Sequence, residues 1–285
     1  MMKWTLLLAA IAASTMAPAD GPSRSTTLDG VRVHYESYGS GKEAVLFIHG
    51  WTCDLTFWRL QAPVYEKRRS LLIDLPGHGA SGKPEISYTQ ELFARAVDAV
   101  MRDAGVEKAV LVGHSMGTPV ALTVLRLYPK KVSGLVIVDG FIPVPPKDEA
   151  EREKQAAQRA EMTKKFRSPD YKQAVDGMFK FMFTEQTPAP LRQEIQQKMS
   201  SAPHHVLASA MEGMMALERP ANLHFEIPAM AIMVKRDAQS DYEKYVHGVF
   251  PKLRSYQAWE GAGHFLMMEQ PERFNTALAE FLDKR

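Results

Sequence analysis

Cysteine is almost absent from this sequence of 285 residues, in which Cys53 is the single example. One cysteine cannot form an intramolecular disulfide, so the stability of the fold must come from its core. No catalytic cysteine signature surrounds Cys53, and this disfavours the thiol as a nucleophile. Histidine, cysteine and carboxylate spacings typical of metal sites are also lacking, so we expect neither a metal nor a cofactor.

The sequence also lacks a strong excess of charge of either sign. Its formal net charge is +2, which argues against nucleic acid or an acidic membrane as the main partner. The one apolar run near the start, residues 4–13, is short for a membrane span.

Residues 1–19 have instead the pattern of a secretory signal peptide. Lys3 supplies the positive start, residues 4–13 the apolar stretch, and Ala17-Pro18-Ala19 a cleavage site. We therefore expect a secreted or periplasmic protein, cleaved near Ala19 and without stable membrane insertion afterwards. The alternative is an N-terminal anchor that stays attached.

What the sequence does contain is a short apolar run, Ala109–Val112, that leads into Gly-His-Ser-Met-Gly at 113–117. An apolar segment of helical length follows, from Thr118 to Tyr128. This order predicts a buried strand, a sharp turn with Ser115 in a strained backbone conformation, and a buried helix. The flanking glycines are needed because a side chain there would collide with the neighbouring strand or helix.

Similar apolar runs and helical patterns alternate along much of the chain, which predicts an α/β fold with a doubly wound, mostly parallel sheet. A capping box at 87–90 and Pro271 each predict the start of a helix. The other predicted strands are Val31–Tyr38 (in an antiparallel edge hairpin), Ala44–Ile48, Leu71–Leu75, Leu135–Val138, Met230–Val234 and Leu253–Trp259.

The alternation breaks between residues 141 and 223, where no convincing buried strand occurs. Four helix-like segments fill this stretch, at 148–166, 170–183, 190–199 and 206–217. We therefore predict a helical cap at 141–223, inserted into an α/β core made of 20–140 and 224–285.

Ser115 needs a base and an acid. His264 is the preferred base, because its small-residue loop follows the last apolar strand. The rival histidines are read as surface or packed residues: His34, His114 (which should point away from the substrate), His204, His205 and His247. For the acid we prefer Asp237, which lies just past Met230–Val234, and Asp139 and Asp241 remain alternatives.

Two backbone amides are candidates for an oxyanion hole, that of Trp51 in the turn after His49-Gly50 and that of Met116 at the start of the helix. Trp58, Phe141 and Phe265 are candidates for the substrate pocket or for plain core. The apolar cap residues are interpreted in the same two ways: Phe179, Met182, Met211, Met214 and Met215.

These motifs, taken in order, resemble the α/β-hydrolase fold superfamily, in particular its capped, esterase-like members with a serine nucleophile. The resemblance covers Val31–Gly140 and Ile227–Arg285 and rests on Phe-Ile-His-Gly at 47–50, Asp-Leu-Pro-Gly-His-Gly-Ala-Ser at 74–81, the serine motif, and Gly-Ala-Gly-His-Phe at 261–265. It implies an acid about where Asp237 stands. Many members have a glycine directly after the preceding strand, whereas this chain has Lys235-Arg236.

The sequence thus predicts an exported serine hydrolase that cleaves carboxylic esters of small, apolar substrates through an acyl-enzyme. A lactonase, a carbon–carbon bond hydrolase and a cofactor-free perhydrolase use the same triad and remain alternatives. A non-hydrolytic ligand-binding protein on this fold is a fourth. The oligomeric state is left open.

Overall fold

The structure is a computed structural model that describes residues 22–217, 222–236 and 239–284. The predicted signal peptide lies outside the described residues, as does Asp237. Within the described ranges, no helix combines the length and apolar character needed to cross a membrane.

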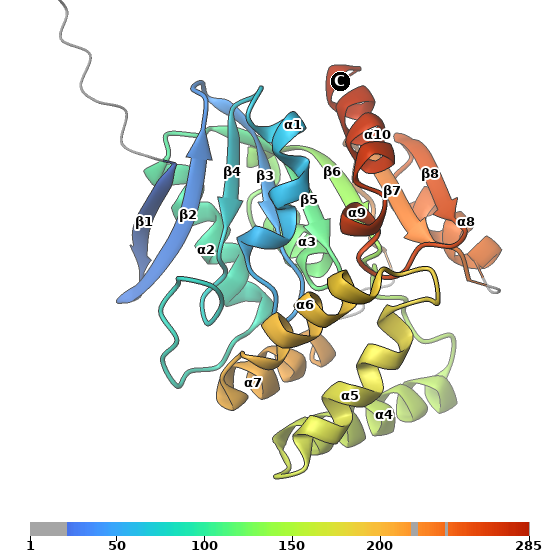
Figure 1. Ribbon diagram of the computed structural model, residues 1–285. Helices are drawn as coiled ribbons and strands as arrows, with labels where there is room; N and C mark the ends of the chain where they lie inside the picture. The colour runs from blue at the N-terminus through green and yellow to red at the C-terminus, as the bar shows by residue number, and fades with distance from the viewer. Residues whose placement is uncertain (1–21, 218–221, 237–238, 285) are drawn as a thin grey trace, which may run out of the picture.

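The centre of the molecule is a sheet to which the described residues contribute eight strands (Figure 1). The strands are β1 (Ser23–Leu28), β2 (Val31–Tyr38), β3 (Glu43–Ile48), β4 (Ser70–Ile73), β5 (Lys108–His114), β6 (Val132–Val138), β7 (Ala229–Val234) and β8 (Leu253–Trp259).

The strands lie in the order β1-β2-β4-β3-β5-β6-β7-β8. Strand β2 is antiparallel to both β1 and β4, and all pairs from β4 to β8 are parallel. The predicted doubly wound, mostly parallel sheet and its antiparallel edge hairpin are both confirmed. Apolar side chains bury the inner strands on both faces, as the continuous apolar runs require.

Helices cover both faces of the sheet, with α2 and α3 on one face and α1, α9 and α10 on the other (Figure 1). Helix α2 begins at Gln90, and the side chain of Thr89 caps the Leu92 amide. The N-cap is therefore Thr89 and not Ser87, the first residue of the predicted capping box at 87–90. The helices of the core are η1 (Leu55–Gln61), α1 (Ala62–Tyr65), α2 (Gln90–Asp103), α3 (Gly117–Leu127), η2 (Pro129–Lys131), α8 (Gln239–Val249), α9 (Leu266–Glu269) and α10 (Pro271–Asp283).

Between β6 and β7 the chain forms four helices in the described residues: α4 (Glu149–Arg167), α5 (Tyr171–Met182), α6 (Ala189–Ser200) and α7 (His204–Met215). They lie together across the end of the sheet toward which the parallel strands point (Figure 1). We call these four helices the cap. This edge of a parallel α/β sheet is where ligands bind in such folds, so the cap covers the region where a site is expected.

Candidate active site

Ser115 lies in a tight turn between β5 and α3, with a backbone φ of 51°. Few non-glycine residues adopt this left-handed conformation, which costs free energy and persists where the surrounding structure enforces it. The predicted strand, strained turn and buried helix are therefore present. The turn leaves Ser115 partly exposed while its neighbours are buried.

The two glycines of the motif permit this turn because backbone atoms occupy the space that a side chain would need. A Cβ atom at Gly113 would lie 2.5 Å from the carbonyl oxygen of Gly117, and one at Gly117 would overlap the carbonyl oxygen of Ile48. Helix α3 thus packs directly on strands β3 and β5.

His264 lies beside this turn, although it is far from Ser115 in sequence. The rings of His114 and His264 have centroids 4.7 Å apart, and His114 Nε2 donates a hydrogen bond to the carbonyl of His264 at 2.9 Å. The His264 backbone amide also donates to Met182 at the end of α5, at 2.8 Å. The loop that carries His264 is therefore attached both to the central strand and to the cap.

Asp139 is the carboxylate that contacts this histidine. It follows β6, its side chain is fully buried, and its Oδ2 accepts a hydrogen bond of 2.6 Å from His264 Nδ1. A proton on Nδ1 leaves Nε2 of His264 as an acceptor, which is the tautomer a general base requires.

The sequence favours Asp237 for this role and leaves Asp139 as an alternative, and in the structure it is Asp139 that contacts His264. Asp237 lies outside the described residues, while Asp139 occupies the Nδ1 side of the imidazole. The physical reason is that β6 and β7 are adjacent parallel strands, so a residue that follows either one emerges at the same edge of the sheet. Asp139 has a φ of 38°, a turn conformation that the sequence pattern did not reveal.

Trp51 and Met116 each carry a backbone N–H that has no protein acceptor in the described part of the chain. Met116 caps the N-terminus of α3, where unpaired amides and the helix dipole favour negative charge. A hypothetical Cβ on Gly50, next to Trp51, would lie 3.2 Å from the Ser115 Cβ, so the two turns adjoin. Both turns can thus present amides to one oxygen near Ser115.

The side chain of Trp51 extends into the cap. Its indole N–H donates to the carbonyl of Leu207 in α7 at 3.0 Å, and its ring packs edge-on against Phe166 of α4 at 5.3 Å between centroids. One residue therefore offers its amide to the site and its ring to the cap.

Two of the three predicted pocket aromatics belong to the core. Trp58 is fully buried and packs against Phe47, His114 and Phe274. Phe265 is fully buried as well, and Phe141 is partly exposed. Trp58 and Phe265 act by packing, since neither has a surface on which a substrate could lie.

The comparison with known proteins now decides the family. The family model described as "Alpha/beta hydrolase family" matches residues 45–277, which include the Ser115 turn, the cap and the loop that carries His264. The chain belongs to the alpha/beta hydrolase family.

Three known proteins are similar to this chain in sequence or in structure. A dihydrolipoyllysine-residue acetyltransferase component of the acetoin cleaving system from Cupriavidus necator is 38% identical over 112 residues, which is 39% of this chain and 30% of that protein. A 2-hydroxy-6-oxononadienedioate/2-hydroxy-6-oxononatrienedioate hydrolase from Paraburkholderia phymatum is 33% identical over 128 residues, 40% of this chain and 44% of the relative. The chain thus spans less than half the length of these curated relatives.

A thermophilic esterase from Thermogutta terrifontis has a similar structure. It superposes with a TM-score of 0.75 at 25% identity, covering 92% of this chain and 98% of the esterase.

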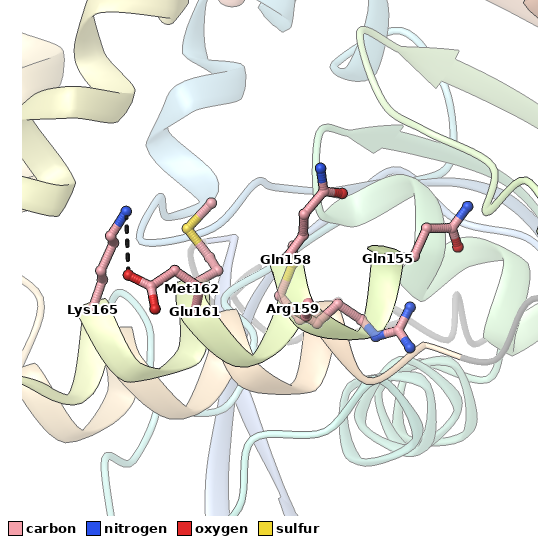
Figure 2. Close-up of a pocket in the computed structure, with 8 residues that line it drawn as sticks. Gln155, Gln158, Arg159, Glu161, Met162 and Lys165 are labelled. Atoms are coloured by element: carbon pink, nitrogen blue, oxygen red, sulfur yellow. Dashed lines mark ion pairs between the residues drawn. The ribbon is translucent and has the colours of Figure 1, made fainter. Parts of the chain in front are cut away.

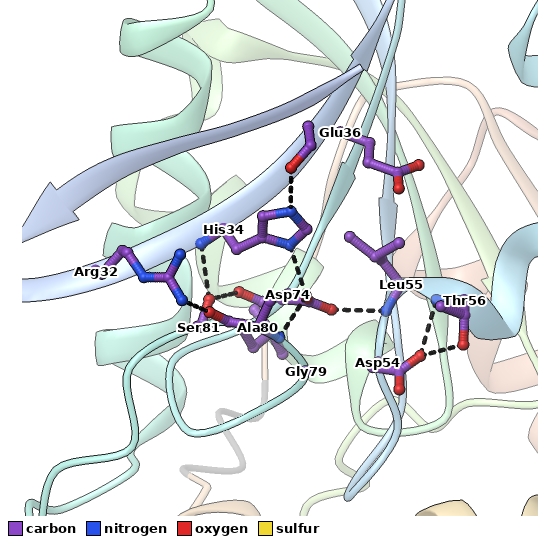
Figure 3. Close-up of polar contacts among 12 residues, drawn as sticks. Arg32, His34, Glu36, Asp54, Leu55, Thr56, Asp74, Gly79, Ala80 and Ser81 are labelled. Atoms are coloured by element: carbon purple, nitrogen blue, oxygen red, sulfur yellow. Dashed lines mark hydrogen bonds and ion pairs between the residues drawn. The ribbon is translucent and has the colours of Figure 1, made fainter. Parts of the chain in front are cut away.

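His34, a rival for the base, lies in a separate hydrogen-bonded cluster of this alpha/beta hydrolase that contains a serine, a histidine and an aspartate (Figure 3). His34 Nδ1 donates to Asp74 at 2.7 Å, and its Nε2 accepts from the Ser23 hydroxyl at 2.9 Å. The Asp74 carboxylate also accepts the amides of Leu55 and Ala80, each at 2.8 Å. These bonds fasten β2, η1 and the loop after β4 together, so we assign the cluster a structural role.

The cap of this hydrolase contains a hollow of about 620 Å³ along α4 (Figure 2). Its wall combines amide, charged and thioether side chains, with an ion pair between Glu161 and Lys165.

Of the methionines predicted to line a pocket, Met215 contributes to this wall. Met182, Met211 and Met214 are buried, so packing accounts for them. Phe179 is buried and borders a second hollow with Phe183.

Three buried histidines predict that this hydrolase loses stability in mild acid. Burial, the largest cause, lowers the pKa of His78 and of His114 to about 3, and lowers that of His49 as well. A folded-state pKa below the unfolded value of about 6.5 means that the unfolded chain binds more protons below that pH. The stabilisation is complete above pH 6.5 and declines as the pH falls toward 3, by about 2 kcal/mol at pH 5 for His78 and by a similar amount for His114.

Urea denaturation at pH 7, 6 and 5 measures this loss directly. Replacing His78 with asparagine, which can still donate to the carbonyl of Pro76, should make the pH dependence shallower. Replacing the exposed His247 with asparagine should leave it unchanged. A free energy of unfolding that is constant between pH 7 and 5 would contradict the prediction.

Two functional candidates emerge from the structure that the sequence did not select. Asp139 is one of the two alternatives for the acid in the sequence, and its position directly after a buried strand is the available signal. Arg236 was not considered, although its side chain contacts the Asp139 carboxylate. An arginine near a strand end carries no signal of its own, because many exposed arginines look the same in sequence.

Proposed function

We propose that this protein is a serine esterase that hydrolyses carboxylic esters of small molecules through an acyl-enzyme. The observation that carries the proposal is the 2.6 Å hydrogen bond between His264 Nδ1 and the buried Asp139, formed beside the strained Ser115 turn. A serine hydroxyl becomes nucleophilic at neutral pH when an oriented imidazole accepts its proton.

In the proposed mechanism, Ser115 Oγ attacks the ester carbonyl while Nε2 of His264 takes its proton. The amides of Trp51 and Met116 stabilise the negative oxygen of the tetrahedral intermediate, where losing one such donor typically costs about 2.7–4 kcal/mol. His264 then protonates the departing alcohol. Water, activated by the same imidazole, attacks the acyl-enzyme and releases the acid.

A panel of p-nitrophenyl esters, from acetate to longer acyl chains, tests the proposal beside a panel of lactones. We expect steady turnover and, after treatment with a fluorophosphonate, a mass adduct on the peptide that contains Ser115. A single-turnover burst without steady hydrolysis would support the ligand-binding alternative. Turnover confined to lactones would support the lactonase.

A carbon–carbon bond hydrolase is the second candidate, because the Paraburkholderia phymatum relative, 33% identical over 128 residues, is named a 2-hydroxy-6-oxononadienedioate/2-hydroxy-6-oxononatrienedioate hydrolase. A 2-hydroxy-6-oxo-dienoate is the discriminating substrate. Its cleavage with a kcat/KM well above that for any ester would replace the esterase proposal.

We also propose that the protein is exported, on the strength of the sequence pattern at residues 1–19. The intact mass of protein recovered from the periplasm or medium tests this. A mature chain starting near Asp20 is the expected result, and a full-length chain in the membrane fraction would favour the retained anchor.

A further inference from the structure

The Asp139 carboxylate has three kinds of donor around it. His264 Nδ1 and Arg236 Nη2 donate to Oδ2, at 2.6 and 2.8 Å. Arg236 Nη1 and the amide of Val234 donate to Oδ1, at 2.8 and 3.0 Å. The guanidinium thus grips both oxygens in the paired geometry that makes arginine–carboxylate contacts strong and directional.

The two ends of this ion pair have different surroundings. The Asp139 side chain has no exposed surface, whereas that of Arg236 is 54% exposed. A buried carboxylate requires a compensating charge. Arg236 provides it from the surface, so the imidazole does not have to become a cation to do so.

We propose that Arg236 is a positioning residue for the triad: it neutralises and orients Asp139, so that the buried carboxylate does not depend on a protonated His264 for its counter-charge. The inference rests on the esterase mechanism proposed above. Arg236 acts through Asp139 and does not itself contact the reacting atoms.

The electrostatics of the pair agree with this geometry. Burial alone would raise the pKa of Asp139, but hydrogen bonds and attraction from His264 and Arg236 outweigh burial and hold that pKa well below its usual range. The same hydrogen bond raises the pKa of Arg236. The pair is thus fully charged throughout the neutral range.

Other titratable groups face the cluster from the elements packed around it. The His114 ring lies against His264, and burial keeps its pKa low, so it is neutral near pH 7. Tyr242 of α8 and Tyr256 of β8 lie within electrostatic range of Arg236, and Glu269 of α9 lies within range of His264. Arg236 is therefore the cation that balances Asp139 when the imidazole is neutral.

The test compares Arg236→Gln and Arg236→Lys with Lys235→Gln in the full chain. Lys235 is a matched control, because it is the neighbouring cation and pairs with Glu260 rather than Asp139. The profile of kcat/KM against pH, from 5 to 9, is recorded with p-nitrophenyl butyrate.

In Arg236→Gln the buried carboxylate has no guanidinium beside it, and this favours the protonated form of His264. We expect the acid limb of the Arg236→Gln profile to move to higher pH by about one unit. This lies at the lower end of the effect that a nearby charge has on a pKa, because Arg236 is partly exposed. At pH 6 this lowers kcat/KM about tenfold, mostly through kcat. Arg236→Lys should restore part of the shift, and Lys235→Gln should follow the wild type.

A second measurement does not depend on turnover. NMR titration of the histidine rings, with His264 assigned by its absence in His264→Asn, should give a higher midpoint for His264 in Arg236→Gln than in the wild type. An unchanged midpoint together with a lower melting temperature would overturn the proposal and leave Arg236 a purely structural role. Absence of ester turnover with a shifted midpoint would instead count against the esterase function alone.

Discussion

Replacing Ser115 by alanine is expected to lower kcat for p-nitrophenyl butyrate by about 10⁶-fold, as loss of the nucleophile does in serine hydrolases. In the proposed mechanism the Ser115 hydroxyl forms the covalent bond to the acyl group, and alanine has no atom that can do so. Alanine fits the same turn, so the melting temperature should change little. Initial rates on protein expressed without contaminating esterase, together with loss of the fluorophosphonate adduct, measure the effect.

Cys53→Ala is the matched control, since it removes the only thiol of the chain. Burial raises the pKa of Cys53 well above its usual value, which suppresses the reactive thiolate. We expect wild-type kcat in this variant. A Ser115→Ala protein that kept more than a few per cent of the wild-type rate would rule out the acyl-enzyme mechanism.

The second large effect is expected from Asp139→Asn, with a loss of about 10⁴-fold in kcat. An amide in place of the carboxylate no longer accepts strongly from Nδ1, so the imidazole loses the tautomer in which Nε2 is a base. KM should change much less, because the substrate does not contact this side chain. Steady-state kinetics at pH 7 to 9 separate the two parameters.

Asp237→Asn and Asp241→Asn serve as controls, because the sequence favours Asp237 as the acid and leaves Asp241 as an alternative. Both should retain kcat within a few-fold of the wild type. Since Asp139→Asn also leaves Arg236 without its carboxylate, circular dichroism must establish that the variant is folded at the assay temperature. A greater loss in Asp237→Asn than in Asp139→Asn would return the role to the residue first preferred.

Much of the fold could be predicted because its signals are local. The apolar runs that became β3, β5 and β6 end at glycine-containing turns, and burial on both faces leaves such runs without alternation. The Ser115 turn was predictable for the same reason, since its strand, its two glycines and its helix are contiguous.

The carboxylate that contacts His264 was not predictable to the same degree. Both Asp139 and Asp237 follow strands that the sequence located, and adjacent parallel strands deliver either residue to the same edge. The choice depends on a positive φ at Asp139 and on the Arg236 side chain, which are properties of tertiary structure. In the cap, Met211 and Met215 lie on one helix with the same chemistry, and only packing decides that Met211 is buried while Met215 borders a hollow.

The double attachment of Trp51 has a consequence for engineering this enzyme. Transplanting the cap of a relative to change which substrates are accepted would remove the Leu207 carbonyl and the Phe166 ring that hold the indole in place. The chimera would then differ in turnover rate as well as in selectivity, because in the proposed mechanism the amide of the same tryptophan stabilises the negative oxygen of the intermediate. A cap exchange should therefore carry residue 51 along with the donor's helices.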